Sequence, residues 1–153
     1  GEDALVGQLV RLLEAERDRL GTRRMLELLS LLLGERALVG DASRYVYEYG
    51  RRAGYSLPAL VHPRAYVSPT ADIRPGAVVL ALAAVGACAV VEQGAIVNMG
   101  AIADHDCVVG ACAHLAPGAI VKAGNTVPAQ MKIESGTVLE RGAAFLPLGG
   151  QHV

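Results

Sequence analysis

One apolar residue recurs at every sixth position between Val61 and Phe145, without a single insertion. The fifteen positions of this apolar series are Val61, Val67, Ile73, Val79, Val85, Val91, Val97, Ala103, Val109, Leu115, Val121, Val127, Ile133, Leu139 and Phe145. A second series lies two residues before the first, and eleven of its fifteen positions are alanine. Residues two apart in a strand point to the same face, so both series point inward. Self-similarity at a fixed period over this length predicts one short unit stacked on itself.

Each repeat has the pattern of a short strand followed by a tight turn. Glycine, which accepts a positive φ, stands at the turn of seven repeats: Gly76, Gly94, Gly100, Gly118, Gly124, Gly136 and Gly142. Three repeats close a triangular coil, and successive coils stack about 4.8 Å apart with continuous backbone hydrogen bonding. We therefore predict a mainly β protein in which residues 57–146 form a parallel β-helix of about five coils. Its resemblance to known hexapeptide-repeat proteins implies the left-handed form.

The residues before position 57 have a different pattern. Leucines at helical spacing predict helices at about 3–19 and 23–34, and a third helix is expected at about 42–53, ending at Gly54. We interpret residues 1–56 as an N-terminal helical cap on the β-helix and residues 147–153 as a C-terminal tail.

Composition argues against several classes of function. The formal net charge is −1, so the chain has no general basic field for nucleic acid. No apolar run reaches the ~18 residues that a membrane-spanning helix needs, and the N-terminus lacks a signal-peptide pattern. Three cysteines without a C-x-x-C pair favour reduced thiols. We therefore expect a cytoplasmic protein with neither membrane insertion nor a nucleic-acid partner.

One coil, residues 97–114, departs from the alanine, valine and glycine of the others. It carries Asp104, His105 and Asp106 in succession, where the apolar series weakens to Ala103. As the second turn residue of its repeat, His105 should lie at a corner of the prism and point outward. An imidazole beside a carboxylate is suited to act as a general base near neutral pH. His114 follows nine residues later, which we expect to put it on a neighbouring face.

These residues belong to a run that resembles a known family. Residues 98–119 read N-x-G-A-x-x-D-H-D-C-x-x-G-x-x-x-H-x-A-P-G-A. This run is similar to the sugar acetyltransferases of the sialic acid O-acetyltransferase and bacillosamine N-acetyltransferase type. The resemblance implies an acetyltransferase of polysaccharide biosynthesis that forms a homotrimer, uses acetyl-CoA as co-substrate and needs no metal. It implies that the acceptor is an amine or hydroxyl of a sugar or a nucleotide-linked sugar.

The same resemblance implies roles for single residues. His105 is expected to be the general base, with Asp106, and Asp104 as a further candidate, orienting its ring. His114 would position the acetyl group and Asn98 would support the His105 region. Further candidates for binding acetyl-CoA lie one coil beyond His105: the backbone N–H groups of Ala123 and Gly124, and the side chain of Lys122.

Departures from the family keep alternatives open. No glycine-rich nucleotide-binding turn is present before residue 57, so the helical cap is either a remnant of a sugar-nucleotide-binding domain or a replacement for it. Asn125, Met131 and Thr137 interrupt the alanine series, which predicts less regular coils after about Lys122. A zinc-dependent carbonic anhydrase would need His residues more closely spaced than these. A non-catalytic trimeric scaffold remains the main alternative.

Overall fold

The computed structural model describes Ala15, Tyr47, residues 50–52, Gly54 and residues 57–145. The chain divides into two units, Gly1–Ala37 and Leu38–Val153, and all described residues except Ala15 belong to the second. The helices expected at 3–19 and 23–34 and the tail at 147–153 therefore lie outside the described residues, apart from Ala15, which is helical. Tyr47 and residues 50–52 are helical, as predicted for the third helix. Gly54 follows as a turn residue with φ of 80°.

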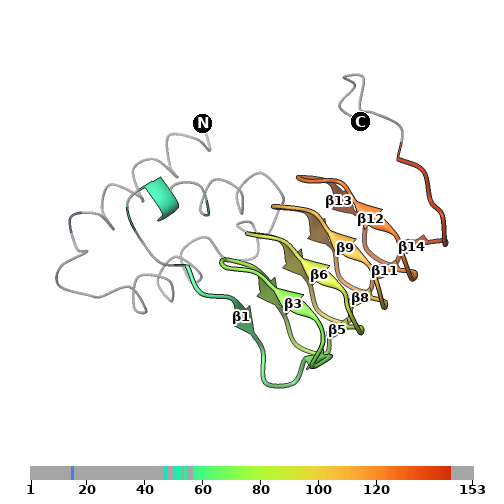
Figure 1. Cartoon of the computed structure of the whole chain (residues 1–153), viewed down its shortest axis with the longest axis horizontal. Coiled ribbons are helices and arrows are strands. Elements are labelled where there is room, and N and C mark those ends of the chain that lie inside the picture. Colours follow the sequence, from blue (N-terminus) through green and yellow to red (C-terminus); the bar gives the residue numbers. More distant parts are fainter. Residues whose placement is uncertain (1–14, 16–46, 48–49, 53, 55–56, 146–153) are drawn as a thin grey trace. The chain divides into compact units, whose positions relative to one another are not determined.

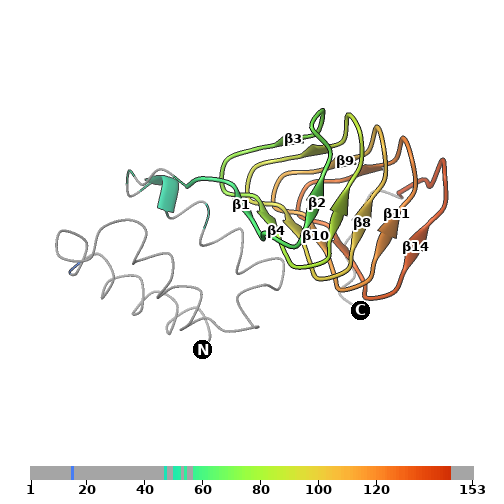
Figure 2. The same ribbon diagram turned by 90° about the horizontal axis from the view of Figure 1, so that it is seen from below.

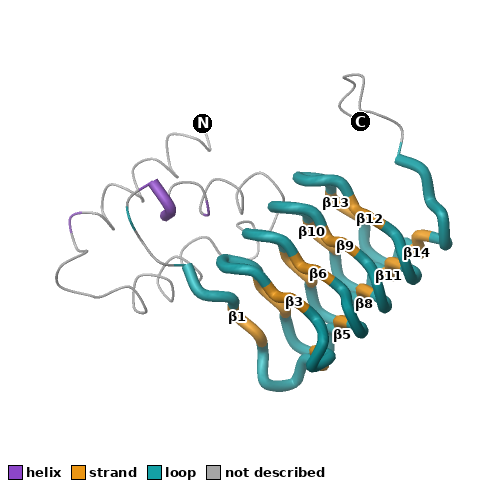
Figure 3. The backbone as a smooth tube through the Cα atoms, in the orientation of Figure 1, coloured by secondary structure: helices purple, strands orange, loops and turns teal. Residues whose placement is uncertain are grey.

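Residues 60–139 form the predicted parallel β-helix, built from fourteen strands of two residues each (Figure 1). The strands are β1 (Leu60–Val61), β2 (Tyr66–Val67), β3 (Asp72–Ile73), β4 (Val78–Val79), β5 (Ala84–Val85), β6 (Val90–Val91), β7 (Ile96–Val97), β8 (Ile102–Ala103), β9 (Val108–Val109), β10 (His114–Leu115), β11 (Ile120–Val121), β12 (Thr126–Val127), β13 (Lys132–Ile133) and β14 (Val138–Leu139). Each strand pairs in parallel with the strand three further along the chain, so residues eighteen apart face each other. Turns separate the strands throughout (Figure 3).

Three sheets form the walls of the prism. Their strand orders are β1-β4-β7-β10-β13, β14-β11-β8-β5-β2 and β12-β9-β6-β3. Figure 2 shows the coils following one another along the stack from β1 to β14. The strands make four complete coils, ending at β12, and β13 and β14 begin a fifth. The prediction of about five coils was therefore slightly too high, because the last apolar position, Phe145, lies outside any strand.

Both inward series form the core, as predicted. The fully buried side chains include Val79, Val85, Val91, Val97, Val109, Leu115, Val121 and Val127, together with the alanines between them. A narrow prism leaves room for only one small and one medium side chain per repeat, which explains why alanine alternates with valine. Burial of this continuous apolar column supplies the main stabilisation of the fold.

The coils after Lys122 are regular, so the prediction of irregularity there was wrong. Strands β12, β13 and β14 pair in register with β9, β10 and β11. Asn125 explains the difference, because its inward side chain is 3% exposed and hydrogen-bonded to the next coil. Its Nδ2 donates to the carbonyl of Glu140 at 2.9 Å, and its Oδ1 accepts from the amides of Gly142 and Ala143 at 3.1 and 3.2 Å. Asn125 therefore holds the last turn of the β-helix from inside.

Candidate active site

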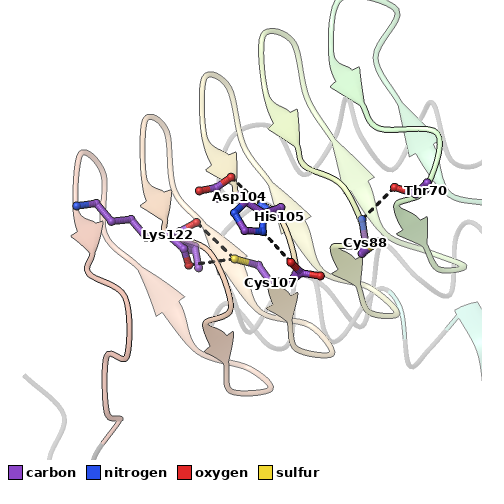
Figure 4. Close-up of polar contacts among 8 residues, drawn as sticks. Thr70, Cys88, Asp104, His105, Cys107 and Lys122 are labelled. Carbon is purple, nitrogen blue, oxygen red and sulfur yellow. Dashed lines mark hydrogen bonds and ion pairs between the residues drawn. The ribbon is translucent and has the colours of Figure 1, made fainter.

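The turn between β8 and β9 carries the predicted Asp104–His105–Asp106 cluster at one corner of the prism. Figure 4 shows Asp104 and His105 at this corner, with Cys88 and Thr70 in the coils before them and Lys122 in the coil after. Asp106 has φ of 57°, a left-handed conformation that aspartate tolerates better than most residues. This conformation turns the carboxylate of Asp106 back toward the ring of His105.

His105 and Asp106 form a direct pair. Nδ1 of His105 lies 2.7 Å from Oδ2 of Asp106, and their side chains are 53% and 63% exposed. An ionised carboxylate can only accept a hydrogen bond, so Nδ1 is the atom that carries the proton of the neutral ring. Nε2 is then left with a lone pair, which is the arrangement that a general base requires.

Asp104 contacts His105 in a different way from the one predicted. Its Oδ1 accepts a hydrogen bond from the backbone N–H of His105 at 2.7 Å. Such a contact fixes the path of the main chain at the turn. Among the described contacts, Asp106 orients the imidazole, and Asp104 holds the backbone from which the imidazole projects.

Asn98, which directly follows β7, and His114, the first residue of the neighbouring strand β10, form a second, buried pair. Nδ2 of Asn98 lies 3.0 Å from Nε2 of His114. Oδ1 of Asn98 accepts from the backbone N–H of Met99 at 2.8 Å, so the donating NH₂ group faces the histidine. Nε2 of His114 therefore accepts, and the neutral ring carries its proton on Nδ1.

That Nδ1–H group of His114 is buried and has no hydrogen-bond partner among the described residues. The residue is only 4% exposed. Burial lowers the pKa of His114 below its usual value, and the positive charge of Lys132 lowers it further, while Glu134 opposes these effects. His114 is therefore a neutral hydrogen-bond donor that lacks an acceptor, which is a costly arrangement for a buried group unless something binds there.

The two pairs lie on opposite sides of the prism. The His105 corner joins the sheet containing β8 to the sheet containing β9, whereas His114 belongs to β10 in the third sheet. In a triangular prism the third face is the one opposite that corner. His114 therefore lies on the face across the prism from the His105 corner, and the chain passes along the whole face of β9 between them.

Residues one coil beyond His105 lie directly beside it in the stack. The amide of Gly124 donates to the carbonyl of His105 at 3.1 Å, so this N–H group is already engaged. The amide of Ala123 has no such partner among the described residues. Nζ of Lys122 lies 2.5 Å from Oε2 of Glu140, in an exposed ion pair.

The structure adds neighbours that we did not predict for the site. Cys88 is exposed and stands one coil before Asp106, and its amide donates to Oγ1 of Thr70 at 3.1 Å. The spacing of eighteen residues between Thr70, Cys88 and Asp106 was the signal that would have found them. Cys107, by contrast, is part of the core as predicted, and burial raises the pKa of its thiol.

Two absences can be stated for the described part of the chain. It contains no group of three or more His, Cys, Asp or Glu side chains that could hold a metal ion. Nor does any helix within it have the length and apolar character to cross a membrane.

Comparison with known proteins gives matches among solved structures. No protein-family model matches the chain, and no curated protein does. The acetyltransferase domain of PglB from Neisseria gonorrhoeae, in complex with acetyl-CoA, is 31% identical over 69% of this chain and 62% of that chain, with a TM-score of 0.57.

A second match is PerB, a perosamine N-acetyltransferase from Caulobacter crescentus, in complex with CoA and GDP-perosamine. It is 35% identical over 67% of this chain and 59% of that chain, also with a TM-score of 0.57. The chain thus spans about three fifths of the length of these structures. The similarity confirms the resemblance seen in residues 98–119: this chain is similar in sequence and fold to the hexapeptide-repeat sugar acetyltransferases.

Proposed function

We propose that this protein is an acetyltransferase that moves an acetyl group from acetyl-CoA to an amine or hydroxyl of a sugar or nucleotide-linked sugar. The observation that carries the proposal is the His105–Asp106 pair, with Nδ1 and Oδ2 2.7 Å apart on an exposed corner. That corner lies in the run that resembles the sugar acetyltransferases. Similar structures hold acetyl-CoA in one case and CoA with GDP-perosamine in another.

His105 acts in this proposal as the general base. Its Nε2 takes the proton from the acceptor amine or hydroxyl as that group attacks the thioester carbonyl of acetyl-CoA. A tetrahedral intermediate forms and then collapses, the carbon–sulfur bond breaks, and His105 returns the proton to the departing thiolate of CoA. Asp106 keeps the ring in the required tautomer and stabilises its charged form. A base positioned in this way contributes about 10²–10⁴-fold to the rate.

The negative oxygen of the tetrahedral intermediate needs a hydrogen-bond donor. Of the two amides predicted for this role, that of Gly124 already donates to His105. We therefore assign the role to the backbone N–H of Ala123, which lies one coil beyond His105. A single donor of this kind is worth about 10²–10³-fold in rate.

Asn98 and His114 enter the site from a second copy of the chain. They lie opposite the His105 corner, so one prism cannot bring the two pairs together. A cyclic homotrimer, in which the corner of each prism meets the Asn98–His114 face of the next, would do so three times. His114 is only 4% exposed in the single chain, so its unpartnered Nδ1–H would donate to the carbonyl oxygen of the acetyl group only once assembly makes that atom accessible.

A column of outward-facing apolar side chains along one sheet supports contact between copies of the chain. The outer side chains of β2, β5, β8, β11 and β14 are Tyr66, Ala84, Ile102, Ile120 and Val138, and none is charged. Tyr66 is 62% exposed and Val138 is 45% exposed. Ile102 is also exposed, whereas Ala84 and Ile120 are partly buried. Contiguous exposed apolar residues often mark a surface that binds another protein. Strand β8 leads directly into the Asp104–Asp106 turn, so a second prism on the column would reach the His105 corner.

Lys122 is the candidate ligand for the phosphates of CoA. Its ion pair with Glu140 is exposed, and such pairs contribute only about 0–1 kcal/mol. Replacing the Glu140 carboxylate with a phosphate of CoA therefore costs little free energy.

Release of the CoA thiol from acetyl-CoA tests the proposal, with GDP-perosamine as the first acceptor because PerB was solved with it. We expect His105→Ala to lower the rate about 10²–10⁴-fold while the oligomer remains folded. His62→Ala is the matched control, since His62 is exposed and lies in a different corner. A non-catalytic scaffold would bind no acetyl-CoA, and His105→Ala would then change nothing that can be measured.

Mixing two inactive variants tests the shared site. Subunits carrying His105→Ala are combined with subunits carrying His114→Ala, after partial unfolding and reassembly. If each site takes His105 from one subunit and His114 from the next, random mixing restores about one quarter of native activity. Absence of any recovery would place both residues in sites within single chains and contradict the trimer proposed here.

A further inference from the structure

We propose that Gly86 is a positioning residue for His105: the lack of a side chain at position 86 allows the turn that carries the base to lie close against the coil before it. This inference rests on the proposed function, because it assigns Gly86 a role in the reaction through His105. A Cβ atom added to Gly86 would lie 2.6 Å from the backbone nitrogen of His105 and 2.8 Å from the carbonyl carbon of Asp104. Both distances are well below van der Waals contact.

The backbone conformation of Gly86 does not itself require glycine. Its φ is outside the positive range, unlike the φ of Gly76 or Gly94. Other coils place larger residues at the equivalent point of this corner, namely Ser68, Asp104, Lys122 and Glu140. The turn therefore accepts a side chain in general, and the requirement at position 86 comes from the close approach of Asp104 and His105.

Hydrogen bonds hold both sides of this contact in place. The amide of Gly86 donates to the carbonyl of Ala103 at 2.8 Å, just before Asp104. The amide of Asp106 donates to the carbonyl of Ala87 at 2.9 Å, just after His105. A methyl group at position 86 would thus push on a peptide that is tied down on either side. The peptide between Asp104 and His105 is the part that has to move.

A displacement of that peptide would act on both contacts of the base. The backbone N–H of His105 donates to Asp104, and its ring pairs with Asp106, each at 2.7 Å. Misplacement of a catalytic group by about 1 Å can cost about 10²-fold in rate. We expect Gly86→Ala to lower kcat about 10–100-fold, with little change in the KM for acetyl-CoA, because no group assigned to CoA binding is touched.

Gly110 provides a matched control. A Cβ atom there would lie 2.6 Å from the backbone nitrogen of Ala129 and 2.8 Å from the carbonyl carbon of Pro128. Its φ is also outside the positive range. The added Cβ atom would also lie 2.6 Å from the carbonyl oxygen of Val127, so the steric conflict is at least as severe as at position 86. It falls, however, on a corner that carries none of the proposed catalytic or binding groups. Gly110→Ala should lose at least as much thermal stability as Gly86→Ala.

The test measures kcat, KM and melting temperature for the native oligomer, both glycine variants, and Gly86→Ala combined with His105→Ala. We expect kcat to fall in Gly86→Ala and to stay native in Gly110→Ala. In the His105→Ala variant, the additional Gly86→Ala substitution should lower kcat hardly any further, because Gly86 acts only through His105.

Three results would overturn the inference: native kcat in Gly86→Ala, an equal fall in kcat in Gly110→Ala, or additive losses in the double variant. Failure of Gly86→Ala to assemble while Gly110→Ala assembles would also overturn it, since Gly86 would then be a folding residue. If the native protein transfers no acetyl group, the proposed function fails instead. Crystal structures of the two glycine variants would still show whether the His105 turn moves in Gly86→Ala.

Discussion

Acidification should destabilise the protein through His114, which is buried in a neutral form. Burial and Lys132 both lower the pKa of His114, so the folded chain resists protonation there. The unfolded chain takes up a proton at the usual pKa near 6.5. The folded state consequently binds fewer protons than the unfolded state between the lowered pKa and about pH 6.5. Stability is complete above this window and is lost as the pH falls through it.

The size of the effect follows from proton linkage. One fully suppressed protonation site contributes a slope of about 1.4 kcal/mol per pH unit. Between about pH 7.5 and about pH 5.5, His114 should therefore remove at most about 1.4 kcal/mol from the free energy of unfolding. Glu134 opposes the shift, and its negative charge keeps the effect below this limit.

Urea unfolding at a series of pH values measures this slope in the native protein and in His114→Gln, which keeps a polar side chain but does not titrate in this range. The native curve minus the variant curve should rise with pH up to about pH 6.5 and then become flat. Parallel curves, or a difference that falls with rising pH, would refute a lowered pKa of His114 in the folded protein.

Three further predictions concern single residues. Asp106→Gly should leave the free energy of unfolding within about 1 kcal/mol of the native value, because glycine relieves the positive φ but loses more chain entropy on folding. The rate of acetyl transfer should nevertheless fall in this variant. A variant as active as the native protein would contradict the role of the carboxylate. Asn125→Ala should lower the free energy of unfolding in urea by about 2–4 kcal/mol, since four side-chain hydrogen bonds to the last coil are lost. Hydrogen exchange should become faster at Gly142 and Ala143, and unchanged exchange there would contradict this role of Asn125. A thiol reagent should label the exposed Cys88 in the folded protein and leave the buried Cys107 unlabelled, which peptide mass spectrometry measures. Equal labelling of the two cysteines would show that the coil containing Cys107 opens readily.

The period of the sequence predicted most of the fold. Inward and outward positions, the three strands per coil and the corner position of His105 all follow from residues six and eighteen apart. Asn125 was misjudged because a polar residue in the alanine series resembles an interruption when its partners are unknown. Those partners are backbone groups of Glu140, Gly142 and Ala143, and backbone groups leave no mark in the sequence.

The candidate site was predicted less completely than the fold. The pairing of His105 with Asp106 follows from adjacency, but the contact of Asp104 with a backbone amide depends on the detailed path of the turn. The role of Gly86 could not be predicted from the sequence, because it depends on how closely the backbone of Asp104 and His105 approaches in the next coil and not on the φ of Gly86 itself. The separation of His105 from His114 follows from counting strands: β9 lies between them, so their corner and face are opposite.

Binding of acetyl-CoA tests the central claim most directly. Calorimetric titration of the folded oligomer measures both affinity and stoichiometry, and it needs no knowledge of the acceptor. We expect one acetyl-CoA per chain, with an affinity that is reduced by His114→Ala and only slightly changed by His105→Ala. Absence of binding at millimolar acetyl-CoA, in a protein shown to be folded, would contradict the proposed acetyltransferase and favour a scaffold.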